Sequence, residues 1–346
     1  MQGDQMKRDR VFIVADDLTG ALDSAATFAE HGARVRVACT PDNLTEALAS
    51  PADVVAVATG TRELSESDAR DVVTSVARHL AEHKGLLFKK VDSRLKGNIA
   101  AEIDALIPSE KTLFFNPAVP KLDRYCMDGA VVGSGIDAPI PVAGRLGRSI
   151  KICDARTQQD LIEQLPNALG ESAFAGAAGL AEALACRLWP EGIKIRQTRP
   201  TLPAMMAVGS RDPVTGGQIE ALGNVPIVTA PNGFCRQFPQ VPLLLIRMTR
   251  GAEEISPGTA SDEFAKTLEH AYRFLSPTTI FACGGESAGA LLQRLGVGQL
   301  DVDGEVMPGM PVARCIGQVH LSLITKSGGF GQPDALVKLV KLLNLQ

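Results

Sequence analysis

The chain has 346 residues, of which 45% are hydrophobic and 4% aromatic, and its formal net charge is −4. This length predicts two domains, and the weakly acidic balance argues against a nucleic-acid or anionic-membrane partner. The seven cysteines form no C-x-x-C pair, the first ten residues lack an apolar stretch, and no apolar run is long enough to span a bilayer. We therefore expect reduced thiols and a cytoplasmic location.

Strand-like and helix-like patterns alternate from the N-terminus to about residue 190. A strand is predicted from Val11, and a helix from Ala21. Ser65 and Asp68 form a capping box that predicts the start of a longer helix. Further strands are predicted to begin at four residues: Ala33, Asp53, Gly85 and Thr112. Strands separated by helices indicate parallel βαβ units.

The rest of the chain contains an irregular stretch, a boundary and a second α/β pattern. Residues 125–150 are rich in Gly and Pro and predict short β pieces, and a strand leading into an Ala-rich helix follows from Ser172. Residues 191–203 carry prolines and charges without periodicity, which indicates a linker. The sequence thus predicts domains over 1–190 and 204–346, each a mainly parallel sheet flanked by helices. Strands of the second domain are predicted to begin at Ala204, Val241, Thr278 and Val319.

Three apolar strands of the second domain stop at a Gly-rich turn where a helix pattern begins. These turns contain Gly209 and Ser210; Gly284, Gly285, Glu286 and Ser287; and Lys326, Ser327, Gly328, Gly329 and Gly331. Helix N-termini offer N–H groups to phosphate, and glycine lets the backbone approach an anion. Because such turns share one edge of a parallel sheet, they favour a nucleotide site over bare helix caps. The P-loop and Rossmann glycine signatures are absent from the sequence, which argues against both of those classes.

Charged and polar residues follow the predicted strands of the first domain instead. They are Asp16, Asp17 and Thr19 after the first strand, Arg62 after the third, and Lys89, Lys90, Asp92, Ser93, Arg94, Lys96, Gly97 and Asn98 after the fourth. Carboxylates accept hydrogen bonds from substrate hydroxyls, and Arg or Lys can clamp a carboxylate. A helix cap and a solvated charge run would explain the same residues. This run, however, interrupts a buried strand and ends in a Gly-Asn pair at a helix start, which favours a binding site.

At these residues the sequence resembles the four-carbon acid sugar kinase family. Six segments carry the resemblance in order: VADDLTGALD at Val14, FKKVDSRLKGNIAAEI at Phe88, NPAVP at Asn116, GSRDPVTGGQI at Gly209, GGESA at Gly284 and ITKSGGFG at Ile324. KLDRYCMDG, from Lys121, is a loose match to a further family segment, and the chain is trimmed between Val241 and Ser261. The resemblance implies a sugar-acid-binding domain followed by an ATP-binding domain. It further implies phosphorylation of acids such as threonate, erythronate or 3-oxo-tetronate.

The resemblance also implies roles for particular residues. ATP is expected on Ser210, Gly284, Gly285, Glu286, Ser287, Gly328 and Gly329, with Mg²⁺ on its phosphates and the metal ligands left open. The acid is expected on Asp16, Arg62, Lys90, Asp92, Ser93, Arg94, Gly97 and Asn98. Domain closure would bring the γ-phosphoryl group to a substrate hydroxyl in the interdomain cleft. Asp17 is the expected base, with Asp92 second, and one aspartate of the Asp16-Asp17 pair is expected to cap the helix while the other faces the cleft. A homo-oligomer is left open.

Two other functions fit parts of the sequence. GESAG, from Gly285, matches the nucleophile elbow of α/β-hydrolases, with Ser287 followed by Asp301 or Asp303 and by His320. His320 lies in an apolar strand pattern, however, and the chain after Ser287 is too short for the rest of that sheet. A non-catalytic protein that binds a sugar acid or a nucleotide is the second alternative. An ATPase assay with candidate acids would distinguish it from the kinase.

Overall fold

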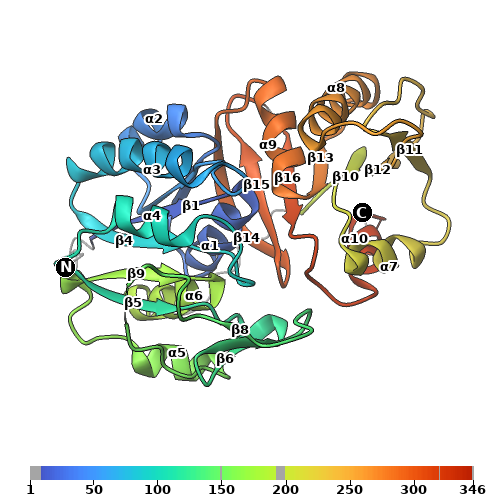
Figure 1. The fold of residues 1–346 in the computed structure, drawn as a ribbon. Helices are drawn as coiled ribbons and strands as arrows, with labels where there is room; N and C mark the ends of the chain where they lie inside the picture. Colours follow the sequence, from blue (N-terminus) through green and yellow to red (C-terminus); the bar gives the residue numbers. More distant parts are fainter. Residues whose placement is uncertain (1–8, 149, 192–198, 319, 345–346) are drawn as a thin grey trace.

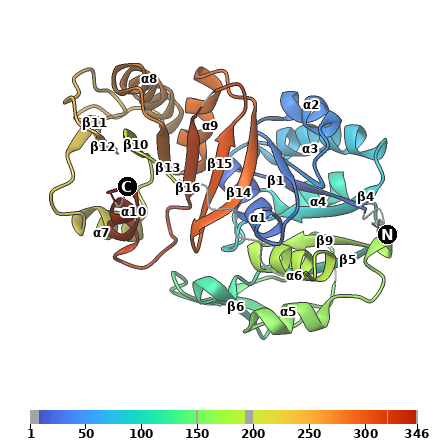
Figure 2. The ribbon, with the colours of Figure 1, turned by 180° about the vertical axis from the view of Figure 1, so that it is seen from behind.

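The computed structural model describes residues 9–148, 150–191, 199–318 and 320–344, and one large sheet runs through this part of the chain. Its 13 strands lie in the order β11-β12-β10-β13-β16-β15-β14-β2-β3-β1-β4-β9-β5, with helices on both faces (Figures 1 and 2). The predicted α/β class with mostly parallel strands is therefore confirmed.

The N-terminal half contributes the parallel part β2-β3-β1-β4-β9-β5. Its strands are β1 (Arg10–Ala15), β2 (Val35–Ala38), β3 (Val54–Ala58), β4 (Gly85–Lys90), β5 (Thr112–Asn116) and β9 (Ser172–Gly176). Its helices are α1 (Leu18–Glu30), α2 (Leu44–Ala49), α3 (Glu66–Ala81), α4 (Ile99–Leu106), α5 (Gln158–Gln164) and α6 (Ala178–Leu188). The predicted short β pieces form a small antiparallel sheet of β6 (Arg124–Met127), β7 (Ala130–Gly133) and β8 (Ile140–Pro141).

The C-terminal half contributes the parallel part β11-β12-β10-β13-β16. Its strands are β10 (Ala204–Val208), β11 (Ile227–Pro231), β12 (Leu243–Thr249), β13 (Thr279–Cys283) and β16 (Ser322–Lys326). Its helices are α7 (Pro213–Glu220), α8 (Pro257–Leu275), α9 (Gly285–Arg294) and α10 (Ala335–Asn344). The strand predicted from Val319 begins later, at Ser322, and residue 319 lies outside the described residues.

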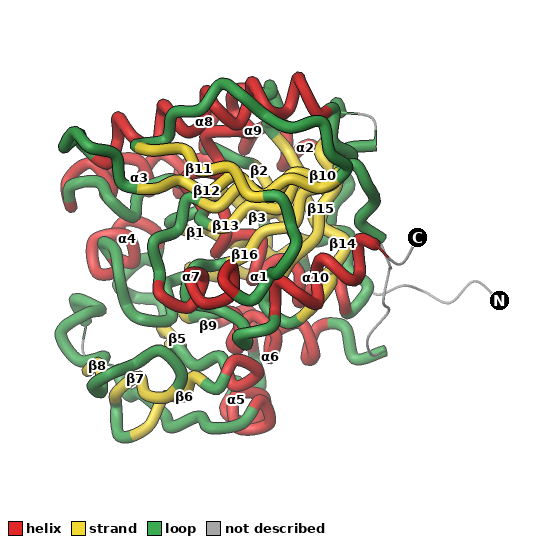
Figure 3. The backbone as a smooth tube through the Cα atoms, turned by 90° about the vertical axis from the view of Figure 1, so that its right-hand side faces the viewer, coloured by secondary structure: helices red, strands yellow, loops and turns green. Residues whose placement is uncertain are grey.

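Alternation along β10 explains how helices cover both faces of this half. Met206 and Val208 belong to the core shared with α7 and α10, whereas Met205 and Ala207 belong to the core shared with α8. Successive side chains of a strand point to opposite faces, so one apolar run serves two cores. Figure 3 shows the strands as a layer between α8 and α9 on one side and α7 and α10 on the other.

A hairpin that the sequence analysis does not predict joins the two halves. β14 (Gln299–Met307) pairs antiparallel with β2, and β15 (Met310–Cys315) pairs antiparallel with β16. The expected two separate sheets are thus one mixed sheet, in which the two parallel parts run in opposite directions. The twist that accumulates over the intervening strands inclines one part steeply to the other (Figure 1).

α1 occupies the centre of the molecule. Every residue from Leu18 to Ala29 is buried, and the helix packs against the sheet, α6 and α9 (Figure 2). Its many alanines allow these elements to approach closely. This position brings the turn between β1 and α1 up to the C-terminal half.

The described part of the chain contains no helix that is long and apolar enough to cross a membrane. All seven cysteines are free thiols. Of the predicted linker, residues 192–198 lie outside the described residues, and the domain boundaries stay predictions.

Candidate active site

Three adjacent parallel strands of the C-terminal half end at the same level. Val208 of β10 lies beside Cys283 of β13, which lies beside Lys326 of β16. The three Gly-rich turns that follow therefore lie at one edge of the sheet, as the sequence predicts. α7 and α9 begin directly after the first two turns, and their first N–H groups can bind an anion.

These turns need glycine because they pack directly on one another. A Cβ at Gly209 would overlap the hydroxyl of Ser287, and a Cβ at Gly328 would overlap that of Ser210. Gly284 has a φ of 112°, which residues with a side chain rarely adopt. The structure thus gathers the predicted nucleotide residues into one compact group.

The ammonium group of Lys326 holds the third turn from inside the protein. It donates to four oxygens: Thr215 Oγ1 and the carbonyls of Ser327 and Phe330 at 3.0 Å, and the carbonyl of Gly328 at 3.3 Å. Lys326 is 1% exposed, and burial lowers the pKa of its ammonium group. Gln218 also donates to the Phe330 carbonyl, at 3.0 Å. The side chains of Lys326 and Gln218 therefore hold the backbone of this turn in place.

The residues of the hydrolase alternative do not converge. Ser287 is buried against the first turn, whereas His320 is exposed in a turn with a φ of 67°. Both candidate carboxylates are engaged in ion pairs: Asp301 with Arg36 at 2.7 Å and Asp303 with Arg314 at 2.9 Å. The predicted Ser–Asp–His order therefore has no catalytic geometry.

A cleft lies where the two halves of the chain meet. Its lining comes from both halves: Asp17, Thr19, Gly20, Asp23, Arg62, Lys90, Asp92 and Ser93 from one, and Gly309, Pro311, Thr325, Ser327 and Phe330 from the other. The sequence analysis predicts five of these residues for the catalytic and acid-binding side: Asp17, Arg62, Lys90, Asp92 and Ser93. Four residues predicted for that side do not line the cleft: Asp16, Arg94, Gly97 and Asn98. The residues predicted for ATP do not line it either: Ser210, Gly284, Gly285, Glu286, Ser287, Gly328 and Gly329. Asp23 and Thr325 were missed.

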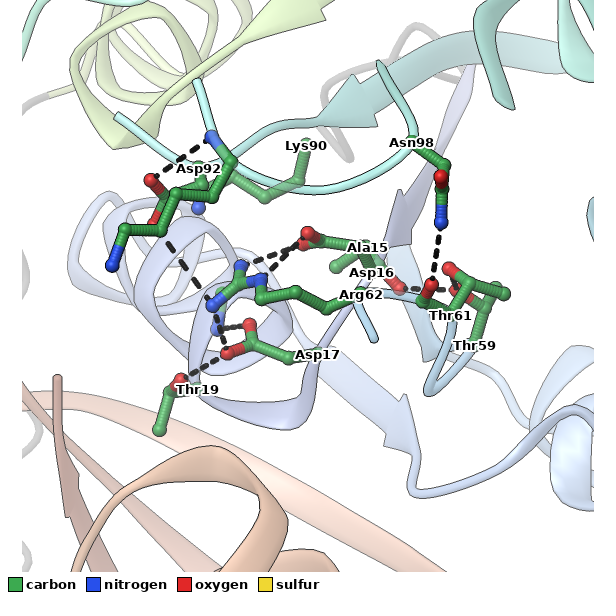
Figure 4. A network of polar contacts seen from close by, with 12 residues as sticks. Ala15, Asp16, Asp17, Thr19, Thr59, Thr61, Arg62, Lys90, Asp92 and Asn98 are labelled. Carbon is green, nitrogen blue, oxygen red and sulfur yellow. Dashed lines mark hydrogen bonds and ion pairs between the residues drawn. The ribbon is translucent and has the colours of Figure 1, made fainter. Parts of the chain in front are cut away.

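Carboxylates that follow β1 hold Arg62 in place (Figure 4). Its Nε and Nη2 each donate to Asp16 at 2.8 Å, and its Nη1 donates to Oδ2 of Asp17 at 2.7 Å. Asp92 lies 3.9 Å from the same Nη1. Asp17 also caps α1, since its Oδ1 accepts a hydrogen bond from the N–H of Gly20 at 2.7 Å.

The prediction that one aspartate caps the helix and the other faces the cleft is wrong, because Asp17 does both. Burial raises the pKa of Asp17, more than the attraction of Arg62 lowers it. Burial acts the same way on Asp16, but the charge and hydrogen bonds of Arg62 outweigh it and hold the pKa of Asp16 below its usual range. Of the two carboxylates, Asp17 is the better proton acceptor.

Two adjacent lysines at the end of β4 have different surroundings. Lys89 is fully buried and pairs with Glu102 at 2.5 Å. Lys90 lines the cleft and is 5% exposed, but its ammonium group has no hydrogen-bond or ion-pair partner among the described residues. It lies over the first turn of α1, where a Cβ at Gly20 would be 3.1 Å from Nζ. Its charge attracts Asp16 and Asp17 without a direct contact, and a buried cation beside a cleft is suited to an anionic ligand.

Arg124 contacts two residues that line the cleft, and the sequence analysis missed it, although it lies in the loosely matched segment KLDRYCMDG. It is 2% exposed, and its Nη1 donates to the hydroxyl of Ser93 at 2.6 Å. Its guanidinium group also lies over the ring of Phe330, 5.3 Å from the centroid. Arg124 therefore positions Ser93 against the third Gly-rich turn.

Arg94 spans the two halves instead of lining the cleft. Its backbone N–H donates to Asp92 at 2.8 Å, and its Nη1 reaches Asp212, the N-cap residue of α7, at 3.3 Å. A Cβ at Gly329 would overlap the same guanidinium group. Arg94 thus contacts the nucleotide turns as well as the loop after β4.

Gly97 and Asn98 support the neighbouring loop. Asn98 Nδ2 donates to the carbonyls of Thr61 at 3.1 Å and Leu64 at 2.9 Å, which lie on either side of Arg62 in the chain. Gly97 has a φ of 86°, which explains the glycine at that turn. Asn98 therefore holds the loop that carries Arg62 into the cleft.

The N-terminus of α9 lies directly against the first turn of α1. A Cβ at Gly285 would be 2.9 Å from Oδ2 of Asp17 and 3.1 Å from Oγ1 of Thr19. The next residue, Glu286, accepts a hydrogen bond from Ser261 at 3.4 Å. The second Gly-rich turn and the aspartate of the cleft are therefore in contact.

Two family models and several curated proteins match the chain. The models are described as "Sugar-binding N-terminal domain", over residues 11–143, and "Nucleotide-binding C-terminal domain", over residues 244–336. A D-threonate kinase of Cupriavidus necator is 29% identical, across 94% of this chain and 95% of its own. A 3-oxo-tetronate kinase of Burkholderia multivorans is 25% identical, across 96% of both chains. A D-erythronate kinase of Heliobacterium modesticaldum is 24% identical, across 96% and 97%.

The first of these alignments extends over 408 positions, so that relative carries internal segments that this 346-residue chain lacks. Two solved structures have the same fold. A Salmonella typhimurium LT2 protein matches with a TM-score of 0.70 and 17% identity, across 95% of this chain and 98% of its own. A Haemophilus influenzae protein matches with a TM-score of 0.65 and 20% identity, across 93% and 97%.

Proposed function

We propose that this chain, which belongs to the four-carbon acid sugar kinase family, transfers the γ-phosphoryl group of ATP to a hydroxyl of a four-carbon sugar acid. The three curated relatives act on D-threonate, 3-oxo-tetronate and D-erythronate. We place the active site in the cleft between the sugar-binding and nucleotide-binding halves.

The contact between Gly285 and Asp17 carries this proposal. The N-terminus of α9 offers N–H groups to a phosphate, and the carboxylate it touches is one that can accept a proton. A phosphoryl group and an acceptor hydroxyl would meet at this point. Phosphoryl transfer depends mostly on such positioning and on charge neutralisation.

We propose that Lys90 binds the carboxylate group of the sugar acid. Arg62 already shares its guanidinium group among Asp16, Asp17 and Asp92, whereas Lys90 has no partner in the described parts of the chain. Its ammonium group would bind the carboxylate of the substrate and add little cost of desolvation, because it is already buried.

Asp17 would accept the proton of the attacking hydroxyl. Its raised pKa makes it a stronger base than an ordinary aspartate, and Thr19 Oγ1 and Arg62 hold its Oδ2 at 2.8 and 2.7 Å. Asp92 remains the second candidate for this role.

Mg²⁺ on the phosphates would need only one or two protein carboxylates. The described residues contain no group of three or more His, Cys, Asp or Glu side chains that could hold a metal, which fits an ion carried mainly by the nucleotide. We propose that Asp212, beside Gly328 and Gly329, and Asp92, which accepts a hydrogen bond from the backbone of Arg94, would supply these carboxylates. The ion would neutralise charge on the transferring group.

ADP release with ATP, Mg²⁺ and each of D-threonate, D-erythronate and 3-oxo-tetronate tests the proposal directly. We expect turnover with at least one of these acids and none without an acid. Binding of an acid and ATP with no turnover would instead favour the non-catalytic alternative.

Lys90→Met is expected to raise KM for the acid by one to two decades, with little change in KM for ATP. Methionine keeps the buried stem but removes the ammonium group, and a charged hydrogen bond contributes about 1.5–3 kcal/mol. Lys96→Met is the matched control, since Lys96 is exposed in the same loop. Steady-state kinetics that show a selective rise in KM for ATP would reverse the assignment of the two halves.

Lys326→Met is expected to weaken ATP binding by about ten- to a hundredfold, because the third turn loses the donor to its carbonyls. Calorimetric titration of each variant with a non-hydrolysable ATP analogue gives the affinity. Lys338→Met, on the exposed face of α10, should bind like the wild type. Unchanged affinity in a folded Lys326→Met protein would mean that this turn does not contact the nucleotide.

A further inference from the structure

Two buried polar atoms that line the cleft have no partner in the described parts of the protein. Asp23 is 7% exposed, and its Oδ1 makes no hydrogen bond. Thr325 is fully buried, and its Oγ1 likewise makes none. Burial of an unsatisfied polar atom destabilises a folded protein, so a ligand that supplied the missing partners would be bound favourably.

Asp23 continues a row of cleft residues along α1. Asp17, the N-cap residue, and Gly20 and Asp23 of the helix are spaced three residues apart, and all three line the cleft. The rise per residue separates Asp17 from Asp23 by about 9 Å along the axis, and side chains lean toward the helix N-terminus, which brings the Asp23 carboxylate closer. The ammonium group of Lys90 lies over Gly20, in the middle of this row.

Thr325 faces the same cleft from the other half of the chain. It lies in β16, two residues before Ser327 of the third Gly-rich turn, and both residues line the cleft. An ionised carboxylate only accepts hydrogen bonds, whereas a threonine hydroxyl can donate or accept. Asp23 would repel a second anionic group, so the chemistry of this pair suits hydroxyl groups.

We propose that Asp23 and Thr325 form a hydroxyl-recognition subsite that selects a polyhydroxylated acid. The inference rests on the proposed function and deepens it: one hydroxyl of the acceptor reacts beside Asp17, Lys90 binds the acid group, and the other hydroxyls bind Asp23 and Thr325. The acceptor is thus held by both halves of the chain, and acids that lack a recognised hydroxyl are poor substrates.

Three substitutions in the full-length protein test the subsite. Asp23→Asn removes the charge, and Thr325→Val removes the hydroxyl at nearly constant shape. Ser24→Ala is the matched control, because Ser24 is a neighbour of Asp23 on α1 whose buried Oγ also has no partner but does not line the cleft. The measurements are the Tm of each variant, the affinity for D-threonate and D-erythronate without nucleotide, and the kinetics with ATP.

We expect Asp23→Asn to weaken acid binding about 10- to 100-fold and Thr325→Val about three- to tenfold, with ATP affinity unchanged. Without ligand, Thr325→Val should keep or raise Tm, because no hydrogen bond within the protein is lost. The affinities of four-carbon acids that lack one hydroxyl provide a further test of the subsite. The analogue without the hydroxyl that Asp23 binds should lose much affinity for the wild type and little for Asp23→Asn.

The outcomes separate this inference from the proposed function. If the wild type phosphorylates an acid and both variants bind it as well as Ser24→Ala does, the subsite is refuted and the kinase stands. If the wild type binds an acid without turnover and Asp23→Asn loses that binding, the subsite stands and the kinase proposal fails. A wild-type protein that binds neither acid refutes the subsite.

Discussion

Asp17→Asn is expected to lower the rate of phosphoryl transfer by about 10²–10⁴-fold while ATP still binds. Asparagine cannot accept the hydroxyl proton, but its side-chain oxygen can still cap α1 through the N–H of Gly20. Arg62 keeps both of its hydrogen bonds to Asp16, so the loop after β3 should hold its position. Single-turnover kinetics and nucleotide titration on the folded variant measure the two effects.

Asp16→Asn is the internal control for this experiment. Asp16 does not line the cleft and forms an ion pair with Arg62. We therefore expect this variant to be less stable but to retain phosphoryl transfer in the folded protein. If Asp16→Asn were inactive and Asp17→Asn active, Asp16 would be the general base instead of Asp17. Normal turnover in both variants would leave Asp92 as the next candidate.

The pH dependence of the wild type provides a second measurement. A general base must be deprotonated, and burial raises the pKa of Asp17. We therefore expect kcat/KM to fall as pH decreases through this raised pKa, earlier on acidification than for an ordinary aspartate. The residual activity of Asp17→Asn should lack this acidic limb. An unchanged limb in the variant would assign the titration to another group.

Gly285→Ala is expected to reduce kcat by about two decades in the folded protein. The added methyl group would lie 2.9 Å from Oδ2 of Asp17 and 3.1 Å from Oγ1 of Thr19, so α9 and α1 must move apart. A misplacement of about 1 Å between reacting groups can cost about 10²-fold in rate. Forcing two packed helices apart also costs stability, so the variant should unfold at a somewhat lower temperature than the wild type.

Gly289→Ala in the same helix is the matched control, because a Cβ there meets no atom within 4 Å. It should turn over like the wild type and be slightly more stable. If Gly285→Ala were as active as Gly289→Ala, the contact between α9 and Asp17 would not be part of the catalytic geometry.

The grouping of the candidate site residues could be predicted because each group follows strands whose apolar runs are plain in the sequence. Parallel strands end at a common edge, so Gly285 and Gly328 could be placed together, as could Asp17 and Lys90. Asp23 and Thr325 were not predicted, because Asp23 lies inside a helix pattern and Thr325 inside a strand pattern and not at the end of either. Arg124 escaped because its partners Ser93 and Phe330 are far away in the chain.

The sequence by itself determined the α/β class, most of the strands and the residue types at their ends, because these depend on local apolar patterning and turn chemistry. The tertiary structure decided how the two halves combine. β14 reads as polar, with Asp301, Asp303 and Glu305 in one strand and a glycine at 304, yet it pairs with β2 and makes one sheet. That pairing between distant segments, and the twist that follows from it, set Gly285 against Asp17, which no local pattern encodes.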